Sequence, residues 1–291
     1  MLKIADISSN NKDNYRQAID ETDAVFIKIT EGITYVNEYA NAQYDYAISK
    51  GKPVGLYHFI VANVSPIAQA NYFFDNAKNY LLDPKTNIML DWEKPEGYAP
   101  LTGDEPKPFL DRMKELTGKS SFLYIGHDDF ISDKYDWSDV TGDYPIWIAG
   151  YPLNDGSDYT PELQDWADKN YFSNPKYKNA SVAMWQYTSV PYDKSMFYGD
   201  IAQWYAYTNL TQPKPQDEPK FKKEQKIRLR PQATHSAYGT KIDDGTKPQF
   251  GVIDYSFPMV KSNSKFAYRV AMHYPNAIVF WHFLEQDLIS D

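Results

Sequence analysis

The sequence predicts an α/β protein in which an irregular (β/α) barrel is followed by a small all-β domain. Short apolar strands alternate with helical stretches through residues 1–210, which is typical of a parallel sheet or a (β/α) barrel. A segment rich in proline and charge follows, and beyond it only strand candidates remain. These observations divide the chain into a barrel at 1–210, a linker at 211–223 and an all-β domain at 224–291.

Apolar runs mark the expected strands of the barrel. They are LKIADIS (2–8), AVFIKITEG (24–32), VGLYHFIV (54–61), NIMLDWE (87–93), SFLYIG (121–126), PIWIAGY (145–151) and ASVAMWQY (180–187). Residues 37–52, 65–81 and 105–119 have helical spacing; Ser65 and Pro66 are typical of a helix start, and Gly118 of a helix end. The helical stretches become sparse after residue 120, so a regular eightfold barrel is not expected.

Composition narrows the class of partner. A hydrophobic fraction of 42% allows a packed core, and 25 Tyr with 7 Trp favour stacking surfaces such as those that bind sugars, although most of these rings are expected in the core. The net charge of −9 argues against nucleic acid or an anionic membrane as the main partner. Residues 211–291 are mildly basic, with 12 Lys and Arg against 9 Asp and Glu. The absence of cysteine excludes disulfides and thiolate metal sites.

Polar and aromatic residues fall at the ends of the predicted strands, where (β/α) barrels place functional groups. They are Asp6, Glu31, Tyr57, His58, Asp91, Glu93, Trp147, Tyr151, Trp185, Gln186 and Tyr187. Acids rimmed by aromatics suit the hydrolysis of a glycosidic bond, in which one carboxyl donates a proton while another stabilises positive charge on the sugar. Each residue alone has a simpler explanation, such as a solvated strand end for Asp91 and Glu93 or a core position for His58 and Trp185. Their coincidence at strand ends favours a site.

Several segments, taken together and in order, resemble the family 25 glycoside hydrolases, which are lysozymes (muramidases) common among phage endolysins. The matching segments are ADISSNN, FIKITEGITYVN, GKPVGLYHF, IMLDWE, FLYIG, PIWIAGY, MWQYT and YGDIAQW. The resemblance implies an irregular, partly flattened (β/α) barrel that cleaves the β-1,4 bond between N-acetylmuramic acid and N-acetylglucosamine with retention of configuration. The ending DISSNN departs from the His-rich or Gln-Gly ending of many relatives, so one sugar contact is expected to differ.

The resemblance also implies roles for the acids. Glu93 matches the general acid/base, Asp91 its charged strand neighbour, and Asp6 the aspartate of the first strand. Asp200 stands where an aspartate usually follows the WQY motif, and Asp193 is the competing candidate. The residues Tyr57, His58, Glu31, Trp147, Tyr151, Trp185 and Gln186 are expected to bind substrate.

Mutual repulsion among these acids should keep one carboxyl protonated near neutral pH, and we expect this to be Glu93, with Asp91 ionised. Retention could then use an aspartate as a covalent nucleophile or the substrate's own 2-acetamido group, oriented by Asp91 or Asp200. Substrate assistance is the favoured route. No cofactor or metal is needed for either.

The segment KIRLRPQATHSAYGTKI (226–242) resembles the opening of bacterial SH3-type cell-wall-binding domains. Such a domain would hold the enzyme on the wall and raise the local substrate concentration, with Tyr238, Tyr255 or Trp281 as candidate binding aromatics. A domain that only packs against the barrel is the alternative.

The expected partner is bacterial peptidoglycan. No signal peptide and no apolar run of about 20 residues is visible, so the protein is expected to stay in the host cytoplasm until a holin-type pore releases it to the wall. A bacterial autolysin exported by another route is the alternative source. A catalytically inactive saccharide-binding protein on the same barrel is the rival function.

Overall fold

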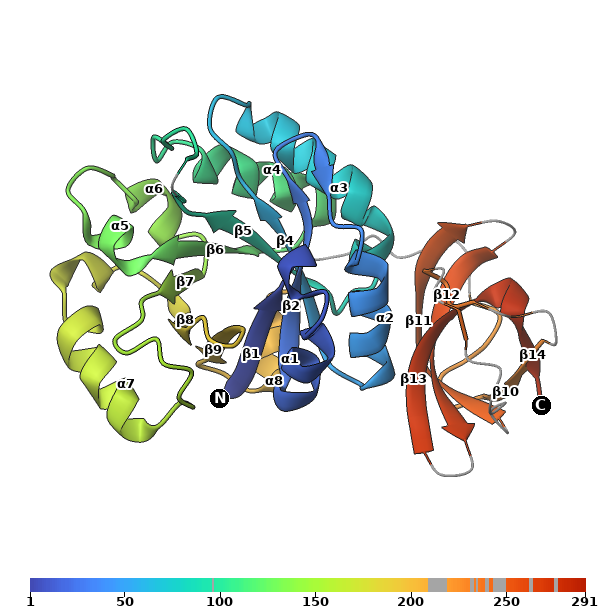
Figure 1. The fold of residues 1–291 in the computed structure, drawn as a ribbon. Coiled ribbons are helices and arrows are strands. Elements are labelled where there is room, and N and C mark those ends of the chain that lie inside the picture. The colour runs from blue at the N-terminus through green and yellow to red at the C-terminus, as the bar shows by residue number, and fades with distance from the viewer. Residues whose placement is uncertain are drawn as a thin grey trace.

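The computed structural model describes residues 1–95, 97–208, 219–230, 233, 235–238, 241–242, 250–261, 264–274 and 277–291. They form a helix-covered barrel and a smaller sheet beside it (Figure 1). Most of the linker predicted at 211–223 lies outside the described residues. No helix in the described part of the chain is both long and apolar enough to cross a membrane.

The barrel strands form a sheet that closes on itself, because β1 pairs with both β2 and β9. The strands are β1 (Leu2–Ile7), β2 (Ala24–Glu31), β3 (Tyr35–Val36), β4 (Val54–Phe59), β5 (Asn87–Trp92), β6 (Ser121–Gly126), β7 (Ile146–Ala149), β8 (Val182–Thr188) and β9 (Asp193–Phe197). Strands β1, β2 and β4 to β8 are parallel where they pair with one another, and β9 runs antiparallel between β8 and β1. The predicted strands are confirmed to within a few residues, whereas β9 and the short β3 at the edge of β2 were not predicted.

Helices cover the outside of the barrel unevenly (Figure 1). They are α1 (Tyr15–Glu21), α2 (Ala40–Ser49), α3 (Pro66–Leu81), α4 (Pro106–Thr117), α5 (His127–Ile131), α6 (Ser138–Thr141), α7 (Pro161–Ala167) and α8 (Ile201–Ala206). Short helical turns η1 (Ser9–Asn11), η2 (Asp168–Phe172) and η3 (Pro175–Tyr177) complete this part. The Ser65 hydroxyl accepts from the Ala68 amide at the start of α3, and Gly118 ends α4 at φ 68°, a left-handed conformation that favours glycine. The helices after residue 120 are short, so the expectation of an irregular barrel is confirmed.

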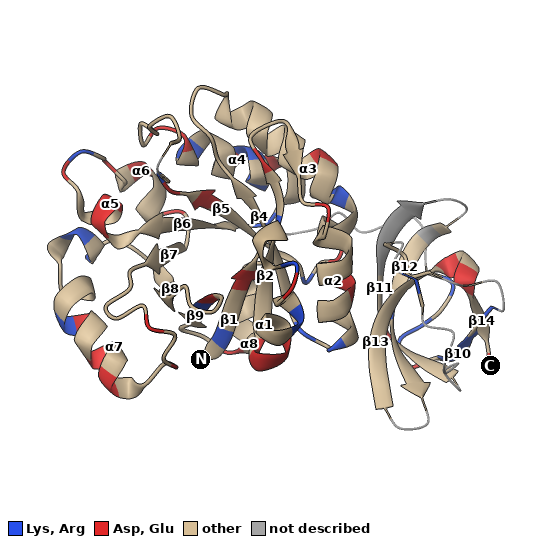
Figure 2. Cartoon of the chain, in the orientation of Figure 1, with Lys and Arg blue, Asp and Glu red and all other residues tan. Residues whose placement is uncertain are grey.

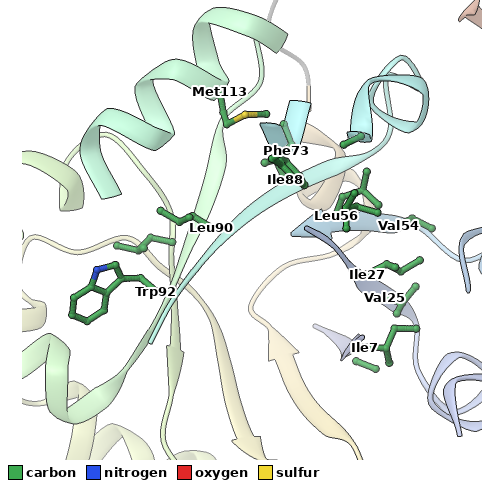
Figure 3. Close-up of a cluster of buried hydrophobic side chains, with 14 of the residues drawn as sticks. Ile7, Val25, Ile27, Val54, Leu56, Phe73, Ile88, Leu90, Trp92 and Met113 are labelled. Carbon is green, nitrogen blue, oxygen red and sulfur yellow. The ribbon is translucent and has the colours of Figure 1, made fainter. Parts of the chain in front are cut away.

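Two apolar layers follow from the alternation of side chains along each strand. Outward residues such as Leu56 and Leu90 meet Phe73 of α3 and Met113 of α4 (Figure 3). Inward residues such as Phe26 fill the barrel, and Trp204 of α8 packs among them. Each fully buried side chain of this size contributes about 1.5–3 kcal/mol. The inward layer thus lies directly beneath the polar residues at the carboxyl ends of the strands.

The C-terminal part is an antiparallel sheet, which confirms the all-β prediction. Its strands are β10 (Lys226–Leu229), β11 (Phe250–Lys261), β12 (Ser264–Tyr274), β13 (Ala277–Leu284) and β14 (Leu288–Ser290), with the turn η4 (Glu285–Asp287), and the spatial order is β13-β12-β11-β10-β14. Ile227, Ile253 and Phe283 are central to its core. The closer assignment to the SH3 type stays a prediction.

The sheet packs on the barrel through β13 and α2 (Figure 1). The Tyr238 ring lies 4.8 Å from the ring centroids of both Tyr44 and Tyr80, and the Tyr255 hydroxyl donates to Asp83. Two of the three aromatics considered for wall binding, Tyr238 and Tyr255, are therefore engaged in holding the sheet on the barrel. This favours the packing alternative for these two side chains.

Candidate active site

A cavity of about 530 Å³ opens at the carboxyl ends of the barrel strands. Its lining residues come from almost every strand or the loop that follows it: Asp6, Ser8, Ser9, Asn10, Lys28, Glu31, Tyr35, Tyr57, Phe59, Met89, Asp91, Glu93, Pro95, Tyr98, Tyr124, Tyr151 and Asp193. The acidic residues on β1 and β5 are red in Figure 2. The predicted location of the site, at the strand ends, matches this cavity.

Four carboxyl groups converge on the cavity. Asp91, on β5, and Glu93, just beyond its end, share one side of the chain as the i, i+2 spacing requires. Asp6 on β1 and Asp193 on β9 are direct partners in the antiparallel pairing of those strands. Strand alternation and cross-strand register therefore place all four acids at one mouth of the barrel.

Burial and mutual repulsion raise the proton affinity of this group. Burial raises the pKa of Asp6 and of Asp91 well above the ordinary value, and neighbouring carboxylates raise both further. Burial and the charge of Glu93 raise the pKa of Asp193 to about 7. The four acids thus titrate together, and the cluster holds protons near neutral pH.

The direction of the pKa shift at Asp91 differs from the expectation that this carboxyl is ionised. Burial raises the pKa of Glu93 while the charge of Lys28 opposes it, whereas the deeper Asp91 has a pKa well above its usual range. Asp91 is only 7% exposed and Glu93 is partly exposed. The rise at Glu93 agrees with the expectation that this carboxyl holds a proton, whereas the rise at Asp91 is opposite to the ionised state expected for it, because Asp91 is the less solvated carboxyl.

The cavity continues past Glu93 into a second hollow of about 440 Å³. Glu93, Pro95, Tyr124 and Tyr151 line both hollows. In the second hollow the ring of His127 stacks on that of Tyr171 with 3.9 Å between centroids, which forms a flat aromatic surface. A chain of sugars could therefore extend to both sides of Glu93.

Several predicted site residues lie on the cavity wall, and others do not. Asp6, Glu31, Tyr57, Asp91, Glu93 and Tyr151 line it. His58 is fully buried, hydrogen-bonded to Thr30 and Gln69 and stacked on Phe109 of α4. Trp185 points outward to the helix layer, while Trp147 faces inward below the cavity and donates to Ser195. His58 and Trp185 both face the outside of the barrel. Side chains alternate along a strand, and their neighbours Tyr57 and Gln186 face inward.

Asp200 lies outside the cavity and Asp193 lines it. The Asp200 carboxylate accepts from the Gln203 amide, and the Gln203 side chain accepts from the Asp200 amide, so Asp200 caps the start of α8. The competing candidate Asp193 takes the position predicted for Asp200. The sequence DIAQ (200–203) contains this capping pattern, which could have removed Asp200 from consideration.

Lys28 was not predicted as a site residue, although its ammonium lies 2.7 Å from the Glu31 carboxylate and over the Phe59 ring. Lys28 and Phe26 are two residues apart on β2, so both side chains face into the barrel, and this spacing could have identified Lys28. Among the described residues no group of three or more His, Cys, Asp or Glu side chains is arranged to hold a metal ion.

Comparison with known proteins agrees with this architecture. The profile of Glycosyl hydrolases family 25 matches residues 5–196. The lysozyme of Streptococcus phage Cp-1 is 28% identical over 201 residues, which cover 66% of this chain and 52% of that protein. The autolytic lysozyme of Clostridium acetobutylicum is 29% identical over 155 residues, which cover 53% of this chain and 46% of that protein. The chain thus spans about half the length of these relatives.

Solved structures share the fold. A muramidase from Trichobolus zukalii superposes with a TM-score of 0.55 at 25% identity, covering 72% of this chain and 100% of that one. The modular Cpl-1 endolysin, solved with a peptidoglycan analogue, has a TM-score of 0.50 at 22% identity, covering 91% of this chain and 73% of that one. The family match extends over nearly the whole barrel, from β1 into β9. The chain therefore belongs to glycosyl hydrolase family 25.

Proposed function

We propose that this chain is a lysozyme that cleaves the β-1,4 bond between N-acetylmuramic acid and N-acetylglucosamine in bacterial peptidoglycan. The observation that carries the proposal is the convergence of Asp6, Asp91, Glu93 and Asp193 on a groove lined by aromatic rings. Paired carboxyl groups of different proton affinity are the groups that glycoside hydrolysis requires. The lysozymes among its relatives support peptidoglycan as the substrate class.

Glu93 is the proposed general acid and base because it lines both hollows and is less buried than its neighbour Asp91 on β5. A glycosidic oxygen that bridges the two hollows would meet this carboxyl. Its raised pKa favours the protonated form that donates to the leaving oxygen. A bound sugar excludes water from Glu93 and strengthens this preference.

Retention is proposed to proceed by substrate assistance. Burial raises the pKa of Asp91 well above its ordinary value, which disfavours the ionised form that a covalent nucleophile needs. The 2-acetamido oxygen of the substrate can attack the sugar carbon instead, with Asp91 or Asp193 hydrogen-bonded to the acetamido N–H. A trapped glycosyl-enzyme on an aspartate would contradict this route and support the covalent one.

Digestion of purified Gram-positive cell walls, followed by mass analysis of the fragments, tests the proposed bond. Fragments with muramic acid at the reducing end are expected. Glucosamine at the reducing end would indicate cleavage of the other glycosidic bond, and released peptides with intact glycan would contradict the reading. Tight wall binding without any fragment would support the rival, an inactive saccharide-binding protein.

We also propose that the C-terminal sheet adds wall affinity through its mild positive charge. Lys222 and Lys223 are exposed at its start. Pelleting of the inactive Glu93→Gln chain with walls, before and after charge reversal at both lysines, tests this idea. Pelleting that is unaffected by the reversal and by salt would contradict a charge-based attachment.

A further inference from the structure

Gln186 occupies an unusual place beside the groove. Its place in the sequence predicted a substrate contact, yet Gln186 is 1% exposed and does not line either hollow. It lies on β8 with its side chain inside the barrel, between residues that do line the groove. A buried amide needs partners for its polar atoms, and those partners show what it does.

The amide joins three groove residues. Its carbonyl oxygen accepts from the hydroxyl of Tyr124 at 2.6 Å and from the hydroxyl of Tyr151 at 2.5 Å. Its nitrogen donates to Oδ2 of Asp6 at 3.0 Å. Tyr151 is 36% exposed at the mouth of the groove, and Asp6 is 8% exposed within it. One side chain thus connects the mouth to the acid cluster.

The chemistry of the amide makes this arrangement directional. A carboxamide accepts at one end and donates at the other, and two phenol donors at the oxygen leave the NH₂ facing Asp6. A donor at this point favours the ionised form and one orientation of the Asp6 carboxyl. A glutamate at position 186 would add a fifth acid to the cluster, and an apolar residue would leave the Asp6 carboxyl and the hydroxyls of Tyr124 and Tyr151 without this partner.

We propose that Gln186 is a positioning residue of the hydrolytic site, which uses the hydroxyls of Tyr124 and Tyr151 to aim its NH₂ at Asp6 and keep that carboxyl oriented and ionised during the reaction. This inference rests on the proposed function. It replaces the substrate contact expected for Gln186 from the sequence with a role that acts through Asp6.

The surroundings of Asp6 determine the direction of the effect. The groups that face it are Asp193 from β9, Asp91 from β5 and Glu93 beyond it, Tyr57 from β4, Tyr124 from β6, and Tyr151 after β7; Lys28 of β2 supplies a cation in the same groove. Burial and the acids raise the pKa of Asp6, and the Gln186 hydrogen bond opposes them. Removing that bond therefore raises the pKa further, and a reaction that needs Asp6 ionised loses activity at the acidic side.

The test measures the rate of lysis of purified walls from pH 4 to pH 9. Gln186→Met should move the acidic limb of the profile to higher pH by about one unit, since a hydrogen bond to a charged group is worth about one pKa unit or more. Gln186→Glu should move it further, because it adds an acid. A purely structural role would give the opposite order, since glutamate keeps the shape and an acceptor for both phenols.

Gln69→Met is the matched control. Gln69 is also fully buried and its amide makes several hydrogen bonds, including both the amide and the carbonyl of Val61, but it lies outside the groove. We expect it to lower stability and to leave the pH profile in place. A profile that moves equally in Gln69→Met, or that does not move in Gln186→Met, overturns the proposal.

Carbon-13 NMR titration of the Asp6 carboxyl separates this inference from the proposed function, because it needs no turnover. The apparent pKa of Asp6 should rise in Gln186→Met relative to the wild type, even if the wild type released no wall fragments. An unchanged Asp6 titration overturns the positioning role whatever the activity. In the active enzyme, the rate effects of Gln186→Met and Asp6→Asn should be non-additive, and additive effects would contradict action through Asp6.

Discussion

The contact between the C-terminal sheet and the barrel includes the buried carboxylate of Asp83, and the contribution of one of its hydrogen bonds to stability can be measured. Asp83 is 2% exposed and accepts from the Tyr255 hydroxyl at 2.6 Å and from the Lys85 amide at 2.9 Å, and His282 lies 3.4 Å away. The ammonium of Lys119, itself fully buried, donates to the carbonyls of Leu81, Asp83 and Thr86 and so fixes the loop that presents Asp83. Tyr255→Phe removes one donor from this carboxylate, together with the contact of the same hydroxyl with Arg269.

A hydrogen bond to a charged group contributes about 1.5–3 kcal/mol, so Tyr255→Phe should lower the free energy of unfolding by about that amount. In a chain of this size the midpoint of thermal unfolding should fall by roughly 2–5 °C. Wall lysis should be unchanged at a temperature where both proteins are folded, because neither Tyr255 nor Asp83 lines the groove.

Tyr268→Phe provides the comparison, since the Tyr268 hydroxyl donates to Glu285 at 2.7 Å within the sheet itself. Hydrogen exchange in the barrel loop at residues 82–86 should accelerate in Tyr255→Phe and not in Tyr268→Phe, because only the first bond crosses to the barrel. A Tyr255→Phe protein whose free energy of unfolding lies within about 0.5 kcal/mol of the wild type, with unchanged exchange in that loop, would show that this hydrogen bond does not hold the sheet on the barrel.

Two further predictions concern the site and the packing of the barrel. Asp200→Ala should lower the free energy of unfolding by about 1 kcal/mol because α8 loses its cap, whereas Asp200→Ser should keep that stability. Both variants should lyse walls at the wild-type rate in a turbidity assay, and Asp193→Ala should not, because only Asp193 lines the groove. Loss of lysis in Asp200→Ala would show that Asp200 is a site residue. Gly55→Ala would place a methyl group 2.2 Å from the Phe26 ring inside the barrel, so it should lower the free energy of unfolding by about 1–3 kcal/mol in a denaturant titration. Gly142→Ala is the control and should be nearly neutral, because its methyl group would meet no atom within 4 Å. Equal effects of the two substitutions would contradict the packing of Phe26 against Gly55.

The sequence predicted the barrel because strand runs and helical spacing are local properties. It also located Asp91 and Glu93 on one side of the chain, since alternation needs no knowledge of the fold. The sequence could not show in the same way which residues of β4 and β8 point into the barrel. Both faces of these strands are buried and apolar, so Tyr57 and His58, or Trp185 and Gln186, were equally plausible as inward residues.

The remaining differences come from contacts between distant segments. Strand β9, with the sequence DKSMF, is short and half polar, so nothing local marked it as the strand that closes the barrel and sets Asp193 beside Asp6. The contact of Tyr238 with Tyr44 and Tyr80 joins residues far apart in the chain, and aromatic composition alone could not distinguish it from a wall-binding surface.

The proposed role of Glu93 as the proton donor in glycan cleavage is tested by comparing the wall-lysis rates of Glu93→Gln and Glu105→Gln. Glu105 is a buried glutamate outside the groove, where it accepts from the Trp92 indole and from the backbone amides of Thr102 and Gly103. We expect Glu93→Gln to fold normally and to release muramic acid reducing ends at least about 10²-fold more slowly, whereas folded Glu105→Gln keeps the wild-type rate. Full activity in Glu93→Gln would contradict the assignment.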